Sequence, residues 1–189
     1  VCLKNNVSII SGAGGTGKSS VVAPLVRLFK QKKIPFAQCS LSGKAASNLS
    51  DITGEEGYTI HRLLSYDGLT GNFLYNKQNN VPYGVIILDE LSLVGGEIFL
   101  KLLQAIPSGS SLIMLEDPNQ LEAIGLTNLL KDCLDSYVIP SAKLTKIHRQ
   151  AARSGIITES LRVSAGENIV SLEPIEETRG VLKDLKIKT

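Results

Sequence analysis

The chain has 189 residues, 43% of them hydrophobic, and a formal net charge of +2. This length suits one domain with part of a second, and the apolar content supports a folded core rather than disorder. The net charge is too small to indicate a nucleic-acid partner by itself. Its distribution is uneven, because residues 1–50 hold seven Lys or Arg and no acid. Nucleotide binding explains part of that bias, and polyanion binding is a second candidate cause.

The three cysteines, Cys2, Cys39 and Cys133, have no C-x-x-C spacing. The sequence therefore indicates neither a zinc site nor a disulfide framework, and a reduced, cytoplasmic compartment is expected. The longest apolar run is far shorter than the roughly 20 residues that a membrane span needs. No signal peptide is visible, so we expect no membrane partner. The chain opens without an initiator Met, which we interpret as a piece of a longer protein.

A glycine-rich stretch follows the first apolar segment. Residues 7–11 run into the pattern G-x-x-x-x-G-K-[ST], and residues 18–31 then show the apolar spacing of a buried helix. Glycine lets successive backbone N–H groups point at one phosphate, and the helix start adds the positive end of its dipole. We therefore predict a P-loop that binds ATP or ADP. Its residues are Gly12, Ala13, Gly14, Gly15, Thr16, Gly17, Lys18, Ser19 and Ser20.

The elements that follow are short. Residues 36–41 are expected to form a strand, and a turn with Lys44 leads into a helix that ends near Ile52. A short helix capped by Thr59 comes next. Residues 66–82 are rich in Gly and Asn, with aromatic and polar residues alternating. We predict that they form a small hairpin insertion that projects from the domain and contributes little to the core.

Two later strands, over 85–90 and 111–115, are apolar almost throughout. Continuous apolar strands that alternate with helices indicate a parallel sheet covered on both faces. We predict an α/β fold of three layers, with a mostly parallel sheet of about five strands whose carboxyl ends share one edge. The remaining expectations are a helix near 126–134, a strand and turn over 143–150, a helix over 155–165, and a weakly patterned tail over 167–189.

Asp89 and Glu90 end the strand over 85–90 and form the second half of the predicted nucleotide site. Ligands of open α/β folds bind at the carboxyl edge of the sheet, where both acids are expected to lie. In this interpretation Asp89 and the Ser19 hydroxyl hold Mg²⁺, Glu90 polarises the attacking water, and Lys18 reaches the β- and γ-phosphates.

Two further residues are candidates for phosphate chemistry. Gln120 follows the next strand, where an amide can sense the γ-phosphate or orient water, although an ordinary D-P-N turn is the simpler alternative. Arg149 follows the last expected strand and could stabilise charge on the transferring phosphoryl group. A surface arginine is the competing interpretation. Neither His61 nor His148 has metal-ligand spacing.

Taken together, these motifs resemble those of RecD-like DNA helicases. The order GAGGTGKS, SGKAA, TIHRLL, ILDELSLV, EDPNQLEAIG and LTKIHRQ is similar to that of the N-terminal motor domain in superfamily one, 5′→3′ branch. This family includes the alpha subunit of exodeoxyribonuclease V. The resemblance covers roughly residues 7–166 and implies a RecA-like, ATP-driven motor on single-stranded DNA. It also implies roles in DNA repair and recombination and, as partners, other subunits of a nuclease–helicase complex.

The resemblance assigns further roles. Residues 66–82 become the strand-separating pin, and Arg149 a γ-phosphate contact. Residues 1–166 become the motor domain, and 167–189 a linker toward a second motor domain. The family usually has Gly before the Asp of its third motif, whereas Glu116 stands here, and we expect extra negative charge near the phosphate. The residues implied to lie on the DNA path are Ser42, Lys44, Thr59 and His61.

Three functions remain open at this stage. The first is the nucleotide-binding half of a DNA helicase. The second is a P-loop module that loads ATP to regulate a partner and hydrolyses little. The third is a P-loop ATPase that acts on something other than nucleic acid. Glu90 and Gln120 favour the first over the second, and the SGKAA and TIHRLL turns and the projecting hairpin argue against the third.

Overall fold

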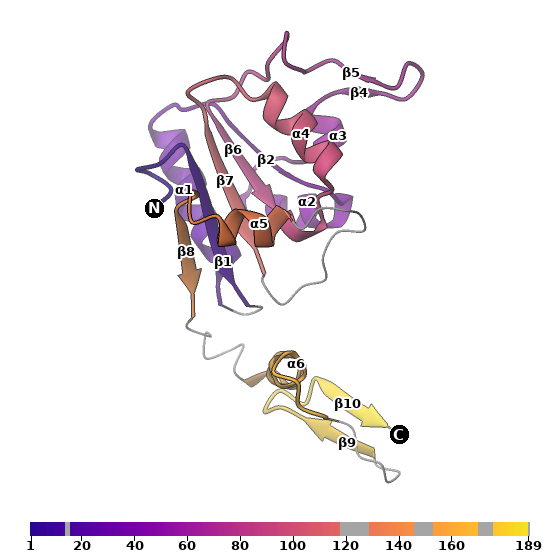
Figure 1. Cartoon of the computed structure of the whole chain (residues 1–189). Coiled ribbons are helices and arrows are strands. Elements are labelled where there is room, and N and C mark those ends of the chain that lie inside the picture. The colour runs from indigo at the N-terminus through magenta and orange to yellow at the C-terminus, as the bar shows by residue number, and fades with distance from the viewer. Residues whose placement is uncertain (14–15, 118–128, 146–152, 170–175, 189) are drawn as a thin grey trace. The chain divides into compact units, whose positions relative to one another are not determined.

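The computed structural model describes residues 1–13, 16–117, 129–145, 153–169 and 176–188 (Figure 1). The chain divides into two compact units. The first comprises Val1–Ser11 and Lys18–Lys143, and the second comprises Gly12–Gly17 and Leu144–Thr189.

The centre of the fold is a six-stranded sheet in the order β3-β2-β6-β7-β1-β8. β1 pairs with β7, β7 with β6, β6 with β2, and β2 with β3, and each of these pairings is parallel. The predicted parallel sheet with its shared carboxyl edge is therefore confirmed. The strands are β1 (Val7–Gly12), β2 (Phe36–Ser40), β3 (Gly57–Thr59), β6 (Val85–Asp89), β7 (Ser111–Glu116) and β8 (Ser141–Leu144).

Helices cover both faces of this sheet, which confirms the three predicted layers (Figure 1). α1 (Lys18–Gln31) and α2 (Gly43–Thr53) pack against each other on one face. The other face carries α3 (Ile60–Leu63), the 3₁₀ helix η1 (Leu91–Leu93), α4 (Gly96–Ala105) and α5 (Leu129–Asp135). In the described part of the chain, no helix combines the length and apolar character needed to cross a membrane.

The strand residues alternate between the two layers, as the pleat requires. One set shares a core cluster with Leu91 of η1 and Leu102 of α4, and includes Ile9, Leu88, Leu112 and Met114. The alternate residues are also buried, and include Ile10, Ile87, Ile113 and Leu115. Burial on both faces explains why the strands read as continuous apolar runs.

The segment 66–82 contains the predicted hairpin, formed by β4 (Tyr66–Asp67) and the antiparallel β5 (Asn72–Phe73). At its tip, Leu69 is 98% exposed. The expectation that the whole segment contributes little to the core is wrong at its carboxyl end. Val81 is 1% exposed, belongs to the core cluster, and donates its backbone N–H to the carbonyl of Ala105 at 2.9 Å.

In the second unit, α6 (Gly155–Ser164) packs on an antiparallel pair, β9 (Glu176–Arg179) and β10 (Leu185–Lys188). Asp184 binds the start of α6, because its carboxylate accepts the Ser154 hydroxyl (2.5 Å) and the backbone N–H of Gly155 (2.7 Å). A Cβ on Gly155 would lie 2.3 Å from the carbonyl oxygen of Arg179, so only glycine allows this approach. The pairing was not predicted for this tail. Its role as a linker stays a prediction.

Candidate nucleotide site

The glycine loop runs from the last residue of β1 to the first residue of α1. A Cβ on Gly12 would lie 2.5 Å from Thr16 Oγ1, so the close approach requires glycine. Thr16 fixes the loop further, since its backbone N–H and its hydroxyl both donate to the carbonyl of Ala13, at 3.1 and 2.6 Å. Gly17 has a φ of +86°, which favours glycine. Gly14, Gly15 and the side chain of Ser19 lie outside the described residues.

Lys18 contacts an acid at the carboxyl edge of the sheet. Its Nζ lies 3.3 Å from Oδ2 of Asp117, the residue that directly follows β7. Both side chains are largely buried, with 16% and 8% of their surfaces exposed. The ion pair therefore holds the ammonium group of the predicted phosphate-binding lysine beside the end of the sheet.

Asp89 ends β6, and Glu90 follows it in an uncommon conformation. Burial raises the pKa of Asp89 above its ordinary value of 3.8. The backbone N–H of Glu90, which donates to Asp89 Oδ1 at 3.0 Å, and the nearby Lys18 oppose this rise. Glu90 has φ 57° and ψ 51°, the left-handed region that costs a residue with a side chain about 1–2 kcal/mol. Strain of this kind is concentrated at functional sites.

The surroundings of Asp89 suit a hard cation such as Mg²⁺. Ser40 is its register partner on β2, and the buried Ser40 hydroxyl has no hydrogen-bond partner among the described residues. An oxygen-rich position with one carboxylate fits Mg²⁺, which keeps several waters and takes few protein ligands. Within the described residues, no group of three or more His, Cys, Asp or Glu could form a metal cage.

Glu116, the last residue of β7, has a different environment from the one expected. It is 1% exposed, and its two carboxylate oxygens accept the backbone N–H groups of Ser92 in η1 and of Asp117, the latter at 2.6 Å. Burial raises the pKa of Glu116 above its ordinary value of 4.5, while these two hydrogen bonds oppose the rise. Glu116 shares its side of β7 with Leu112 and Met114 of the core cluster. Its negative charge is therefore directed at backbone donors rather than at the nucleotide side of the sheet.

The structure brings the four residues assigned to the DNA path to the same sheet edge, since β2 and β3 end side by side with Ser40 opposite Thr59. Two of the four have structural roles. The Ser42 hydroxyl accepts the backbone N–H of Ala45 and caps α2, and the Thr59 hydroxyl caps α3 as predicted. Lys44 is exposed in the first turn of α2.

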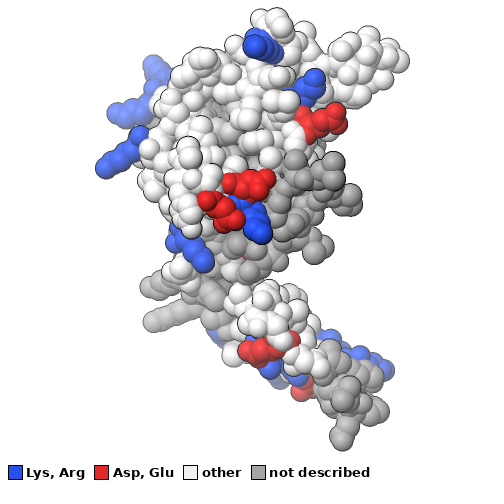
Figure 2. All heavy atoms as spheres, in the orientation of Figure 1, with Lys and Arg blue, Asp and Glu red and all other residues white. Residues whose placement is uncertain are grey.

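The fourth residue, His61, packs against the hairpin. Its ring centroid lies 5.5 Å from that of Tyr66 and 5.8 Å from that of Phe73. These contacts connect α3 to the base of the projecting hairpin. On the face drawn in Figure 2, basic and acidic atoms are interspersed rather than gathered into a patch of one sign.

Two of the predicted catalytic residues, Gln120 and Arg149, lie outside the described residues. Sequence reasoning did not assign Asp117 or Ser40 to the site, and it gave Glu116 no structural partner. The sequence did contain a signal for Asp117, because an apolar strand that leads into two acids occurs at 116–117 as well as at 89–90.

The strand order, the parallel pairings and the glycine loop before α1 define a P-loop nucleotide-binding domain. Residues 1–183 match the AAA domain family AAA_30, and the chain belongs to that family. The suspected kinship with RecD-like helicases is confirmed by similarity to curated relatives of that name.

The ATP-dependent RecD2 DNA helicase of Deinococcus radiodurans is 33% identical over 177 residues, which cover 88% of this chain and 24% of that protein. The RecBCD enzyme subunit RecD of Mycobacterium tuberculosis is 27% identical over 199 residues, which cover 91% of this chain and 34% of that protein. The chain thus spans about a quarter to a third of the length of these two relatives.

Solved helicase structures share the fold. The Pif1 helicase from Bacteroides, in complex with ADP-AlF3 and single-stranded DNA, has a TM-score of 0.57 at 21% identity over 86% of this chain and 44% of that chain. The Pif1 helicase from Candida albicans has a TM-score of 0.54 at 22% identity over 77% of this chain and 37% of that chain. At these identities the similarity concerns the RecA-like fold.

Proposed function

We propose that this chain is the ATP-binding motor domain of a DNA helicase, which couples ATP hydrolysis to 5′→3′ movement on single-stranded DNA in repair or recombination. The observation that carries the proposal is the meeting of Lys18, Asp117 and the Asp89–Glu90 pair at one sheet edge. Relatives named RecD2 DNA helicase and RecBCD enzyme subunit RecD support the helicase function. The second name supports partners in a nuclease–helicase complex. A cytoplasmic location stays a prediction.

Each site residue has one task in this proposal. Lys18 binds the β- and γ-phosphates, and Glu90 orients and polarises the attacking water. Gln120 senses the γ-phosphate, and Arg149 stabilises its developing charge. Ser19 and Asp89 would hold Mg²⁺, which neutralises charge on the phosphate oxygens when bound.

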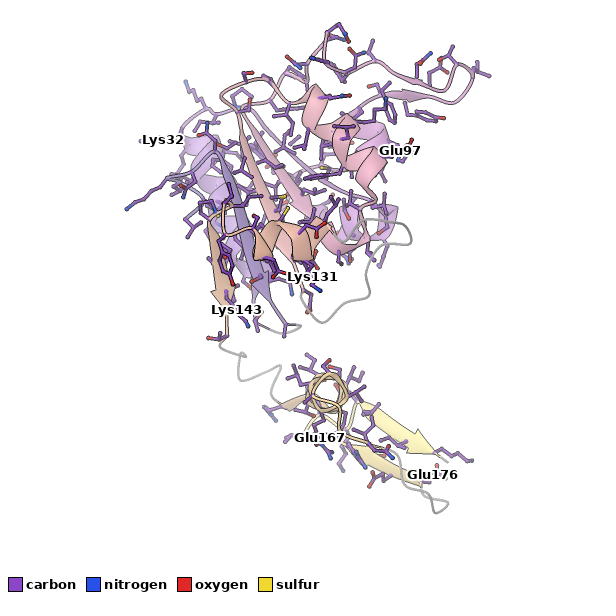
Figure 3. All side chains as sticks on the ribbon, viewed as in Figure 1. Lys32, Glu97, Lys131, Lys143, Glu167 and Glu176 are labelled. Atoms are coloured by element: carbon purple, nitrogen blue, oxygen red, sulfur yellow. The ribbon has the colours of Figure 1, made fainter. Side chains whose placement is uncertain are left out.

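Nucleotide binding tests the first half of the proposal. Lys18→Ala removes a charged hydrogen-bond donor, so ADP affinity should fall by about tenfold or more. Lys32→Ala is the matched control, because Lys32 is exposed beyond the end of α1 (Figure 3). Isothermal titration with ADP and Mg²⁺ gives both affinities. Equal affinities for the two variants would refute the assignment of the P-loop.

DNA binding tests the second half. Single-stranded DNA should stimulate ATP hydrolysis by the full-length protein, and Lys44→Ala and His61→Ala should weaken that stimulation. Removing one phosphate contact should also reduce the slope of log affinity against log salt by about one. Thr59→Ala is a poorer probe, since it removes the cap of α3. Stimulation unchanged in both variants would contradict the proposed DNA path.

The hairpin is proposed to act as the strand-separating pin. Because Val81 belongs to the core, only the projecting residues 67–72 should be replaced by a short turn. The shortened full-length protein should keep its DNA-stimulated ATP hydrolysis and lose duplex unwinding. Unwinding at the rate of the intact protein would refute the pin.

The second candidate is a regulatory module that binds ATP and hydrolyses little. The left-handed backbone of Glu90 favours catalysis over this alternative, because stored strain at an acid beside the phosphate site is typical of active sites. Turnover in the presence of single-stranded DNA decides between them. Tight nucleotide binding without DNA-stimulated turnover would favour the regulatory module.

A further inference from the structure

A single buried carboxylate connects the segments that follow the two central strands. One oxygen of Glu116 accepts the backbone N–H of Ser92, and the other accepts that of Asp117 at 2.6 Å. Glu116 and Ser92 are 24 positions apart in sequence and come from β7 and η1. Hydrogen bonds to an ionised acceptor are roughly twice as strong as neutral ones, so this connection is a firm one.

Each connected segment carries a residue of the nucleotide site. η1 begins directly after Glu90, and Ser92 lies two positions further on. Ser92 is in the first turn of η1, where N–H groups lack an acceptor within the helix, and Glu116 supplies one. Asp117, on the other segment, contacts Lys18 at 3.3 Å. Glu116 thus accepts a backbone hydrogen bond near the start of each segment.

We propose that Glu116 is a positioning residue for ATP hydrolysis, which fixes Glu90 and Asp117 relative to each other through their backbones. The proposal rests on the proposed ATPase function of this site. Glu116 does not touch the nucleotide in this arrangement, since its side of β7 faces the core cluster that contains Leu91. Its effect is therefore on the rate of hydrolysis and not on nucleotide affinity.

A carboxylate is required because, among side chains of this length, it has two oxygen atoms that both accept hydrogen bonds. A glutamine of the same size has one acceptor oxygen, and its NH₂ group can only donate. Glu116→Gln would leave either Ser92 or Asp117 with a buried N–H that lacks an acceptor. The affected segment would then move to find one, and a shift of about 1 Å near the chemistry can cost up to about a hundredfold in rate.

The test compares Glu116→Gln with Glu97→Gln in the full-length protein with single-stranded DNA. Glu97 is exposed on α4 and serves as the matched control (Figure 3). We expect kcat of Glu116→Gln to fall by about tenfold or more, while KM for ATP and the Kd of ADP change less than about twofold. All rates are measured well below the Tm of each variant, so that unfolding does not contribute.

A wild-type kcat in Glu116→Gln overturns the proposal, and so does a lowered Tm with unchanged kcat, which would make Glu116 merely structural. If Glu116→Gln does not fold, Glu116→Asp decides by the same measurements. This variant keeps both acceptors at a shorter reach, so an intermediate kcat with unchanged ADP affinity supports the proposal and a wild-type kcat refutes it. Absence of ADP binding and hydrolysis in the wild-type protein would instead refute the proposed function, and the positioning role with it.

Discussion

The neighbouring strands β6 and β7 each lead into a pair of acids, Asp89–Glu90 and Glu116–Asp117. The two pairs have different roles. In the first pair, Asp89 ends the strand on the side that carries Lys18, and Glu90 follows it in a left-handed conformation. In the second pair, Glu116 ends the strand on the opposite side and binds backbone donors, and Asp117 contacts Lys18. The acid on the side of Lys18 is thus the last residue of β6 in the first pair and the first residue after β7 in the second.

This difference teaches that an acid pair after an apolar strand does not define a role by its residue types. Successive side chains of a strand point to opposite faces, so a shift of one residue exchanges the inward and outward acids. The first acid of one pair and the second acid of the other therefore face the same lysine. Four predictions test whether the two pairs are as different as the structure indicates.

The largest expected difference is in turnover. Glu90→Gln removes the proposed base and should lower kcat by about 10²–10⁴, well beyond the loss expected for Glu116→Gln. Nucleotide affinity should persist, because Lys18 and the loop are untouched. Steady-state ATP hydrolysis by the full-length protein with single-stranded DNA measures this. If Glu116→Gln were the more damaging variant, the roles assigned to the two pairs would have to be exchanged.

The free energy of unfolding should depend more on Glu116 than on Glu90, which is the reverse of the order expected for kcat. Glu116→Ala leaves two backbone N–H groups without acceptors and should cost about 1–3 kcal/mol for each one that stays buried. Glu90→Gly relieves about 1–2 kcal/mol of left-handed strain and adds about 0.5–1 kcal/mol of chain entropy to the unfolded state. The net change at Glu90 should therefore be small. Urea unfolding at pH 7 measures both, and a large loss in Glu90→Gly would contradict the strain argument.

A smaller effect is expected at the acid that contacts Lys18. Asp117 competes with phosphate for the ammonium group and adds negative charge beside an anionic ligand. Asp117→Asn should therefore raise ADP affinity by several-fold, about 1 kcal/mol, which is within the range for a charged hydrogen bond. Asp132→Asn on α5 serves as the surface control. Weaker ADP binding in Asp117→Asn would mean that the ion pair helps to place Lys18 for the nucleotide.

Much of the fold could be predicted because its signals are local. The four long parallel strands are within one residue of their expected ends, since strands buried on both faces appear as unbroken apolar runs. α1 matches its expected bounds of 18–31, and Thr59 caps α3 as expected. The glycine pattern located the phosphate loop, because few residue types permit its backbone.

The parts that were missed depend on tertiary contacts. β3 has three residues and becomes a strand only by pairing with β2. Val81 is buried by α4, which no local pattern near the hairpin reveals. The partners of Glu116 could not be predicted either, because its contact with Ser92 joins a side chain to a backbone N–H in another turn. The sequence gives the residue types at such positions, but it does not show in which direction the backbone N–H groups point.

The last prediction concerns the pH dependence of stability, which tests whether burial or the backbone donors dominate the environment of Glu116. Burial makes the largest contribution and raises the pKa of Glu116 above 4.5, and the negative charge of Asp117 adds to the rise. The backbone N–H groups of Ser92 and Asp117, which donate to the carboxylate, oppose it. A raised carboxyl pKa means that the native state holds the proton more firmly than the unfolded chain. The resulting stabilisation is fully present below the unfolded pKa of about 4.3 and is lost as the pH rises through the native value.

Glu116→Gln does not titrate at this position, so the free-energy difference of unfolding between wild type and variant should change with pH. We expect the advantage of the wild type to shrink as the pH rises from about 4 toward 7, across the unfolded and native pKa values of this carboxyl group. Urea unfolding at a series of pH values measures the difference, and Glu97→Gln in the same series gives the background. An advantage that grows over this range would mean that the two backbone donors outweigh burial, and that Glu116 is held as a strongly stabilised carboxylate.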